Sequence, residues 1–476
     1  MITFFVALAA LIVGYIIYGA FVERVFKPDN RKTPCIAHPD NVDFVPISTG
    51  RAFLIQLLNI AGLGPIFGAL SGAIWGPSVY LWIVFGTIFA GGVHDFLSGM
   101  LSERNDGASI SEIVGIYLGN GMKNIMRVFS VILLVMVGVV FMVGPAGLLA
   151  LLTPNTLQIG FWTIVILLYY FLATILPIDK VIGKLYPVFG ICLIIMALGV
   201  GGATIINSGT RPMMELTLQN LHPEGKPIWP LMFITVACGA ISGFHATQSP
   251  MMARCLTDEK HGRLVFYGAM VAEGIIALIW ASAGIAFYYT TDGGMLALLE
   301  AGGGNSTVVY EMCTKLLGPV GGAIAMVGVI ACPITSGDTA FRSARLTIAD
   351  WFKIDQSDTK KRLLLSAPLL LVGYVISKFD YQIVWRYFSW SNQTLATIAL
   401  WAGATYLGKF VGKKQSFIAA IPATFMSAVS ATYILMADEG LKLSTSIAYP
   451  IGLCIAVVFA SIFIYKVIIG NTKKLS

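Results

Sequence analysis

Ionisable side chains are rare within the apolar segments of this chain, and the few that occur there could carry protons or bind ions. They are His94, Asp95, His245, Glu273 and Asp338. A charged side chain at the centre of a bilayer costs about 2.5–3.5 kcal/mol on insertion scales, so such residues normally face the interior of a helix bundle and serve a function there. Acid–base and ion-binding chemistry is therefore the first hypothesis.

Two histidines are candidates for proton transfer. His245 could carry a coupling proton or meet a substrate carboxylate, because histidine titrates closest to neutral pH; a neutral ring bonded to a carbonyl is the alternative. His94 and Asp95 are adjacent in "GGVHDFLSGM". For this pair, a salt bridge to a loop arginine and a proton relay are equally good readings. Glu273, in "GAMVAEGIIAL", is a further candidate for ion coupling.

Hydroxyl groups surround the remaining carboxylate in "CPITSGDTAF". Thr335, Ser336 and Thr339 stand close to Asp338, and oxygen ligands of this kind suit a hard cation or a proton. The sequence therefore predicts an ion-coupling site here.

A second polar cluster is "WRYFSWSNQTLA", which contains Asn392 and Gln393. Amides and aromatic rings together could line a small-molecule pocket. They could equally form interhelical hydrogen bonds and an interfacial aromatic belt.

Metal binding is a weaker possibility. Cys35 and His38 in "TPCIAHPD" have a ligand-like spacing, and Cys255 and His261 would lie on the same face of the membrane. Zinc needs such residues close together in space, which spacing alone does not show. No full zinc or haem motif is present, so no cofactor is required, and a proton or sodium is the expected coupling ion.

The composition places these residues in a membrane. Of 476 residues, 57% are apolar and 12% are charged, about half the charged fraction of a soluble domain. Apolar windows of about 20 residues recur along the chain. We predict an all-α integral membrane protein with about 13 transmembrane helices, near 2–23, 51–74, 78–102, 124–152, 159–177, 183–207, 228–253, 263–290, 318–341, 362–379, 382–407, 415–436 and 447–469.

The distribution of positive charge predicts the orientation. When the loops are assigned alternately to two faces, all but six of the 31 lysines and arginines fall on one face. Cytoplasmic loops carry such an excess. We expect a multi-pass protein of the cell (inner) membrane, with the N-terminus outside and the C-terminus cytoplasmic. The net charge of +7 thus reflects topology and does not indicate nucleic-acid binding.

A weak internal repeat accompanies this pattern. "GASISEIVGIYLGNGMK" and "GNSTVVYEMCTKLLGPVGG" occupy equivalent places, with Leu118-Gly119 aligned to Leu317-Gly318. Two units of five spanning helices would then be inverted relative to each other, as in many secondary transporters. The predicted organisation is an N-terminal helix and cytoplasmic loop (1–50), repeat 1 (51–207), an extracellular loop (208–227), repeat 2 (228–407), and two C-terminal helices with a cytoplasmic tail (408–476).

Glycine and proline interrupt the first helix of each repeat. They are Gly62, Gly64, Pro65 and Gly68 in "IAGLGPIFGAL", and Gly239, Gly243 and Pro250 in "GAISGFHATQSP". Proline removes a backbone donor and glycine permits unwinding, which at membrane depth is tolerated only inside protein or along a cavity. Paired breaks favour a binding site, although close helix packing also uses glycine.

Several motifs together resemble the carbon starvation protein A (CstA) family: "DNVDFVP", "GLGPIFG", "VHDF", "RNDGASI", "ACGAISGFH", "DTAFRSAR" and "FSWSNQTLA". The resemblance implies inner-membrane transporters of peptides, with relatives that take up pyruvate, induced when carbon runs short. It also implies similarity to the amino acid-polyamine-organocation (APC) superfamily, with a LeuT-like five-plus-five inverted repeat.

The resemblance further implies a substrate site and a cation site. The substrate site would be formed by Gly62, Gly64, Pro65, Ser242, Gly243, Phe244 and His245. The sequence departs from the family pattern after "SGFH", where Gln248 is a further candidate. The hydroxyl cluster around Asp338 would face a cation near the first broken helix.

We therefore expect an ion-coupled secondary active uptake transporter within the lipid bilayer, for peptides first and pyruvate second. A channel-like permease and a membrane enzyme with bound zinc or haem are the alternatives. No HExxH, Walker A or GxSxG motif occurs in the chain, so it is not expected to be an enzyme. The sequence does not indicate an oligomeric state.

Overall fold

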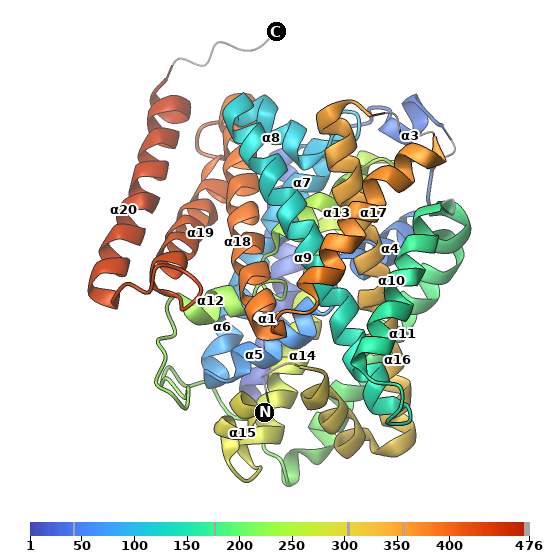
Figure 1. Ribbon diagram of the computed structural model, residues 1–476. Helices are drawn as coiled ribbons and strands as arrows, with labels where there is room; N and C mark the ends of the chain where they lie inside the picture. The colour runs from blue at the N-terminus through green and yellow to red at the C-terminus, as the bar shows by residue number, and fades with distance from the viewer. Residues whose placement is uncertain (41–42, 176–177, 302–304, 355, 357, 471–476) are drawn as a thin grey trace.

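The computed structural model describes residues 1–40, 43–175, 178–301, 305–354, 356 and 358–470, and over these residues the protein is a bundle of helices (Figure 1). The first helices are α1 (Ile2–Gly14), α2 (Ala20–Phe26), α3 (Pro34–Ala37), α4 (Thr49–Ile60), α5 (Ala69–Ala73), α6 (Val79–Leu81), α7 (Gly92–Arg104), α8 (Ile110–Leu118) and α9 (Asn120–Leu152). Then follow α10 (Ile159–Ile175), α11 (Ile178–Ile206), α12 (Leu231–Thr235), α13 (Gly243–Ala253), α14 (Ala269–Tyr289), α15 (Gly294–Glu300), α16 (Ser306–Phe352), α17 (Thr359–Ile376), α18 (Tyr381–Tyr406), α19 (Phe417–Met436) and α20 (Thr445–Phe463).

Shorter turns extend several of these helices. The π-helical segments are η1 (Tyr15–Gly19), η2 (Gly64–Gly68), η4 (Trp82–Gly91), η7 (Arg263–Gly268), η8 (Leu407–Val411) and η9 (Ile464–Ile469), and the 3₁₀ turns are η3 (Gly76–Ser78), η5 (Asn207–Gly209) and η6 (Glu259–His261). The N-terminus lies at the end of the bundle that carries α15, and η9 ends at the opposite end, near α8 (Figure 1).

The helices are those of a multi-pass membrane protein. Within the described residues, eight helical stretches are long and apolar enough to cross a membrane, or nine if one bent pair is a single span. Other predicted segments coincide with shorter or broken helices, such as Ile159–Thr174 and the pair α12 and α13. The prediction of an all-α membrane protein is confirmed, and the count of 13 spans stays a prediction.

Both predicted helix breaks are present. The helical pair Thr49–Ile60 and Gly64–Ala73 is bent by 56° at the first cluster. At the second glycine and proline cluster, residues 236–242 separate α12 from α13. Pro250, however, lies inside α13 and does not form the break. Proline has no backbone N–H, so the hydrogen bond that residue 250 would donate to the Ala246 carbonyl is missing inside this helix.

Candidate functional site

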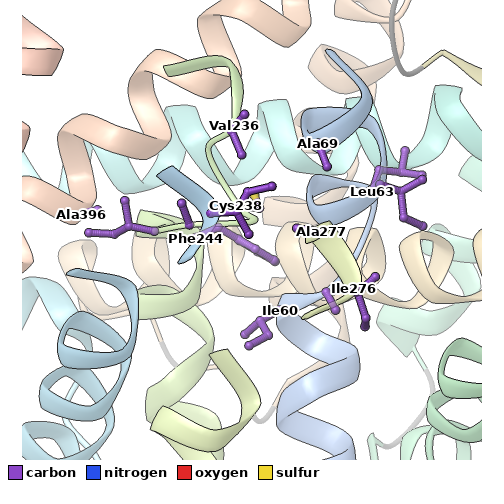
Figure 2. Packing of buried hydrophobic residues seen from close by; sticks show 14 of the residues in the cluster. Ile60, Leu63, Ala69, Val236, Cys238, Phe244, Ile276, Ala277 and Ala396 are labelled. Atoms are coloured by element: carbon purple, nitrogen blue, oxygen red, sulfur yellow. The ribbon is translucent and has the colours of Figure 1, made fainter. Parts of the chain in front are cut away.

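The two helix breaks touch each other in the core of the bundle. A Cβ added to Gly64 would lie 2.1 Å from the Cβ of Cys238, and one added to Gly239 would lie 2.6 Å from the Cβ of Ala277. No side chain fits at such separations, so the crossing of the two broken helices depends on glycine at both positions. Figure 2 shows Cys238 near the centre of this packing, with Ala277 and Phe244 around it.

A network of imidazoles and carboxylates lies beside the second break. His245 on α13 places its Nδ1 2.8 Å from Asp95 Oδ2 and its Nε2 3.2 Å from Glu273 Oε2. The other Asp95 oxygen, Oδ1, lies 2.7 Å from His94 Nδ1. All four side chains are fully buried. Asp95 therefore bridges two rings from α7 and α13, and α14 supplies the second carboxylate.

The network has unused hydrogen-bonding capacity at both ends. His94 Nε2 has no partner among the described residues, and the close contact between His245 Nε2 and Glu273 lacks the alignment of a hydrogen bond. Buried charges cost several kcal/mol each unless they are paired. A chain of acids and bases with free capacity at its ends can accept, hold and pass on a proton.

The predicted polar residue Asn392 ties the second break to α18. Its Oδ1 accepts hydrogen bonds from the Phe244 N–H at 2.7 Å and from Ser242 Oγ at 3.1 Å. A Cβ on Gly243 would lie 2.3 Å from the Asn392 carbonyl oxygen. Asn392 thus accepts a hydrogen bond from a backbone N–H of the first turn of α13, and this contact fixes where the half-helix begins.

The predicted glutamines contact neighbouring helices. Gln248 Nε2 donates to Ser343 Oγ on α16 at 3.4 Å, and Gln393 Nε2 donates to the Phe233 carbonyl at 3.5 Å. The side-chain carbonyl oxygen of each glutamine is buried and has no partner among the described residues. These oxygens could therefore accept hydrogen bonds from a polar ligand.

Two amides in the first broken helix, Gln56 and Asn59, were not among the predicted site residues. Gln56 donates to Ser249 Oγ at 3.3 Å, and the buried side-chain oxygens of Gln56 and Asn59 have no partner in the described part of the chain. Amides in an otherwise apolar span, "LIQLLNI", were the available signal.

The hydroxyl cluster divides into two groups. Ser336 Oγ donates to the Leu58 carbonyl at 3.0 Å, beside the end of α4, and the Cys332 thiol lies 3.6 Å from the Ala61 carbonyl. Ser336 therefore lies at the first break.

The other members of the cluster make contacts within α16. Thr335 Oγ1 donates to the Cys332 carbonyl, and Thr339 Oγ1 donates to the Ser336 carbonyl. Asp338 Oδ2 lies 3.5 Å from Arg342 Nη2, which also donates to the Ala173 carbonyl on α10. Asp338 therefore forms an ion pair with Arg342, one helical turn further along α16.

Two cavities of unequal size approach the crossing. At the α15 end, a cavity of about 470 Å³ is lined by Trp385, Ser389, Arg386 and Glu439, among others. The Trp385 indole N–H and the Ser389 hydroxyl are buried there, with no partner from the residues that the structure describes. At the α8 end, the cavity beside Ser343 is only about 50 Å³. Of these two cavities, the one at the α15 end is the larger.

The predicted metal ligands make other contacts. The Cys35 thiol donates to the Leu256 carbonyl, and His261 Nδ1 lies 3.0 Å from Thr49 Oγ1. His38 is exposed at the end of α3. Burial raises the pKa of the Cys255 thiol to about 11, which disfavours the thiolate that zinc binds. Among the described residues, no group of three or more His, Cys, Asp or Glu could hold a metal ion.

Solved transporter structures share the overall architecture. A manganese transporter from Eremococcus coleocola superposes with a TM-score of 0.57 at 11% identity, covering 90% of this chain and 97% of that one. MhsT, solved in complex with L-phenylalanine, gives a TM-score of 0.56 at 13% identity, covering 88% of this chain and 97% of that one. The fold is therefore LeuT-like.

Sequence comparisons give the family. An uncharacterised membrane protein of Haemophilus influenzae is 41% identical over 60% of this chain and 91% of its own length. The peptide transporter CstA of Escherichia coli K12 is 24% identical over 87% and 78%, and the pyruvate/proton symporter BtsT of the same organism is 24% identical over 69% and 56%. The family model described as carbon starvation protein CstA matches residues 1–149, 149–291 and 289–433. The chain belongs to the carbon starvation protein CstA family.

Proposed function

We propose that this protein is a proton-coupled secondary active uptake transporter of peptides, with pyruvate as the second candidate substrate, that serves the carbon starvation response. The observation that carries the proposal is the buried network of His94, Asp95, His245 and Glu273 beside the crossing of the two broken helices. The names of the relatives, peptide transporter and pyruvate/proton symporter, support both substrates and the coupling ion.

Substrate would bind where the half-helices meet. The first turn of α13 begins at Gly243, beside the His245 ring, and helix N-termini favour anionic groups such as a substrate carboxylate. The side-chain oxygens of Gln56 and Gln248, which have no partner within the described residues, could accept hydrogen bonds from the ammonium or amide groups of a peptide. Substrate binding and protonation would thus occur on neighbouring groups, which allows one to control the other.

Sodium is the alternative coupling ion. The carbonyls of Leu58 and Ala61 and the hydroxyl of Ser336 lie together at the end of α4. Carbonyls at the C-terminal end of a half-helix suit a cation. We favour the proton, because the Asp95–His245 network is a separate buried set of titratable groups.

Alternating access would proceed by rocking of two inverted repeats, 51–207 and 228–407, around the crossing. Gly119 (φ 97°, ψ 168°) and Gly318 (φ 72°, ψ 179°) support the repeat, because each joins a short helix to a long one with nearly the same unusual backbone conformation. The segments 1–50 and 408–476 would lie outside the repeats.

The conformation described here would be open toward the outside. The positive-charge bias assigns the α8 end to the cytoplasm. At that end Glu259 accepts hydrogen bonds at 2.5 Å from Arg104 Nε and from the Asp29 N–H, and Arg104 Nη1 donates to the Tyr406 hydroxyl. This cluster joins the loop after α2 to α7, η6 and α18, and would hold the cytoplasmic side closed.

Uptake into proteoliposomes tests the proposal. A labelled dipeptide or pyruvate should accumulate when a pH gradient, acidic outside, is imposed across correctly inserted protein. Accumulation driven by a sodium gradient alone would identify sodium, and not the proton, as the coupling ion. Counterflow with labelled substrate separates a carrier, which shows trans-acceleration, from a channel, which does not. If the folded protein takes up neither the dipeptide nor pyruvate, the proposal is contradicted for both substrates.

A further inference from the structure

An apolar groove opens between α8, α18 and α20 at the α8 end of the bundle. Its volume is about 310 Å³, and its wall includes Ile398, Trp401, Phe459, Ile462 and Phe463. Phe459 and Ile462 are about half exposed. α20 lies at the periphery of the bundle (Figure 1), so the groove faces the surroundings of the protein and is separate from the crossing of the broken helices.

Two lysines contribute to the wall of this groove. Lys409 in η8 and Lys466 in η9 both line it. Each is the chain neighbour of a residue at the closest approach of the two segments, where a Cβ on Gly408 would lie 2.3 Å from Val467 Cγ1. The two side chains therefore leave adjacent points of one helix–helix contact.

These two charges lack anionic partners among the described residues. Neither lysine takes part in any ion pair or hydrogen bond found there, and none of the residues that line the groove is acidic. The nearby Lys413, by contrast, donates to the Ile468 carbonyl at 2.5 Å. Two ammonium groups without an anionic partner among the described residues, next to an apolar wall, suit a ligand with an anionic head and an apolar tail.

We propose that this groove is a binding site for an anionic phospholipid. The phosphate lies between Lys409 and Lys466, and an acyl chain follows the wall toward Ile398, about 16 Å away along α18 at 1.5 Å per residue. Basic pockets between transmembrane helices on the cytoplasmic side bind such headgroups. A free phosphate would leave the exposed apolar wall uncovered, which favours the lipid. The site gives α20, which lies outside the proposed repeats, a role in holding lipid against α18.

Native mass spectrometry of the full-length protein tests this site. The protein is reconstituted in nanodiscs of equal phosphatidylglycerol and phosphatidylcholine and then released into detergent. We expect retained phosphatidylglycerol and an affinity about thirtyfold lower in the double variant Lys409→Gln/Lys466→Gln, from about 1 kcal/mol per lysine. The matched control is Lys360→Gln/Lys361→Gln on α17, which removes two exposed lysines from the same end of the bundle and should bind lipid as the wild type does.

A second variant tests the apolar wall. Ile462→Trp narrows the groove and leaves both lysines in place, and we expect it to lose the retained lipid as well. Unchanged phosphatidylglycerol retention by the double lysine variant would overturn the proposal. Full retention by Ile462→Trp would also overturn it, because the lipid would then be held elsewhere or by charge alone. Neither outcome depends on which substrate the protein transports.

Discussion

His245 Nδ1 lies 2.8 Å from Asp95 Oδ2, and both side chains are fully buried. The contact joins the half-helix α13, which starts at the second break, to α7. Any change in the protonation of this pair alters the attraction between the two helices. The same pair borders the site proposed for substrate, so a proton and a helix movement can be linked here without a long relay.

Asp95→Asn should remove proton coupling and leave the fold intact. Asparagine keeps the shape of the side chain but cannot take up or release a proton. We expect pH-gradient-driven uptake to fall to near background, because the proton gradient no longer acts on this carboxylate, while counterflow exchange loses its pH dependence. Ser98→Ala, one turn further along α7 and also buried, is the control and should transport normally. An unchanged pH profile in Asp95→Asn would exclude the carboxylate from coupling.

Gly64→Ala should disrupt the crossing of the two breaks. The new Cβ would meet the Cβ of Cys238 at 2.1 Å, and overpacking of this kind costs about 1–3 kcal/mol. Thermal unfolding in detergent should show a lower Tm, and uptake should be lost. Gly202→Ala in α11, where nothing lies within 4 Å of the new Cβ, should leave both unchanged. Equal behaviour of the two variants would mean that the breaks do not pack as described.

Asn392→Ala should destabilise the start of α13. The Phe244 N–H and the Ser242 hydroxyl lose their shared acceptor, and a buried unpaired donor costs about 1–3 kcal/mol. We expect a lower Tm than in Ser391→Ala, which changes a buried neighbour on the same helix. If Asn392→Ala is as stable as that control and loses only substrate affinity, Asn392 is a ligand and not a cap.

Arg104→Gln should loosen the end of the bundle that carries α8. The substitution breaks the contacts with Glu259 and Tyr406. In a cysteine-free background, Ser343→Cys, beside the small cavity, should react faster with a thiol reagent when Arg104 is replaced. Glu259→Gln should have a similar effect, and the double variant should add little to either, because both substitutions remove the Arg104–Glu259 interaction. Fully additive rates would show that the two residues act separately.

The sequence predicted the helix breaks because glycine and proline are local signals. It also identified His94, Asp95, His245 and Glu273 individually, since each is an ionisable residue in an apolar segment. Their meeting could not be predicted, because His245 lies 150 positions from Asp95 and the contact depends on how α13 packs against α7. The i,i+4 pair of Asp338 and Arg342 was visible in the sequence and was overlooked.

Simultaneous recording of substrate and proton uptake tests the central claim most directly. Proteoliposomes containing wild-type protein or His245→Gln would receive a labelled dipeptide, or pyruvate if that is the compound transported, while an internal dye reports pH. We predict that substrate acidifies wild-type vesicles in proportion to uptake. His245→Gln should exchange substrate by counterflow without moving protons or accumulating substrate against a gradient. Accumulation by His245→Gln with the wild-type proton-to-substrate ratio would contradict the account.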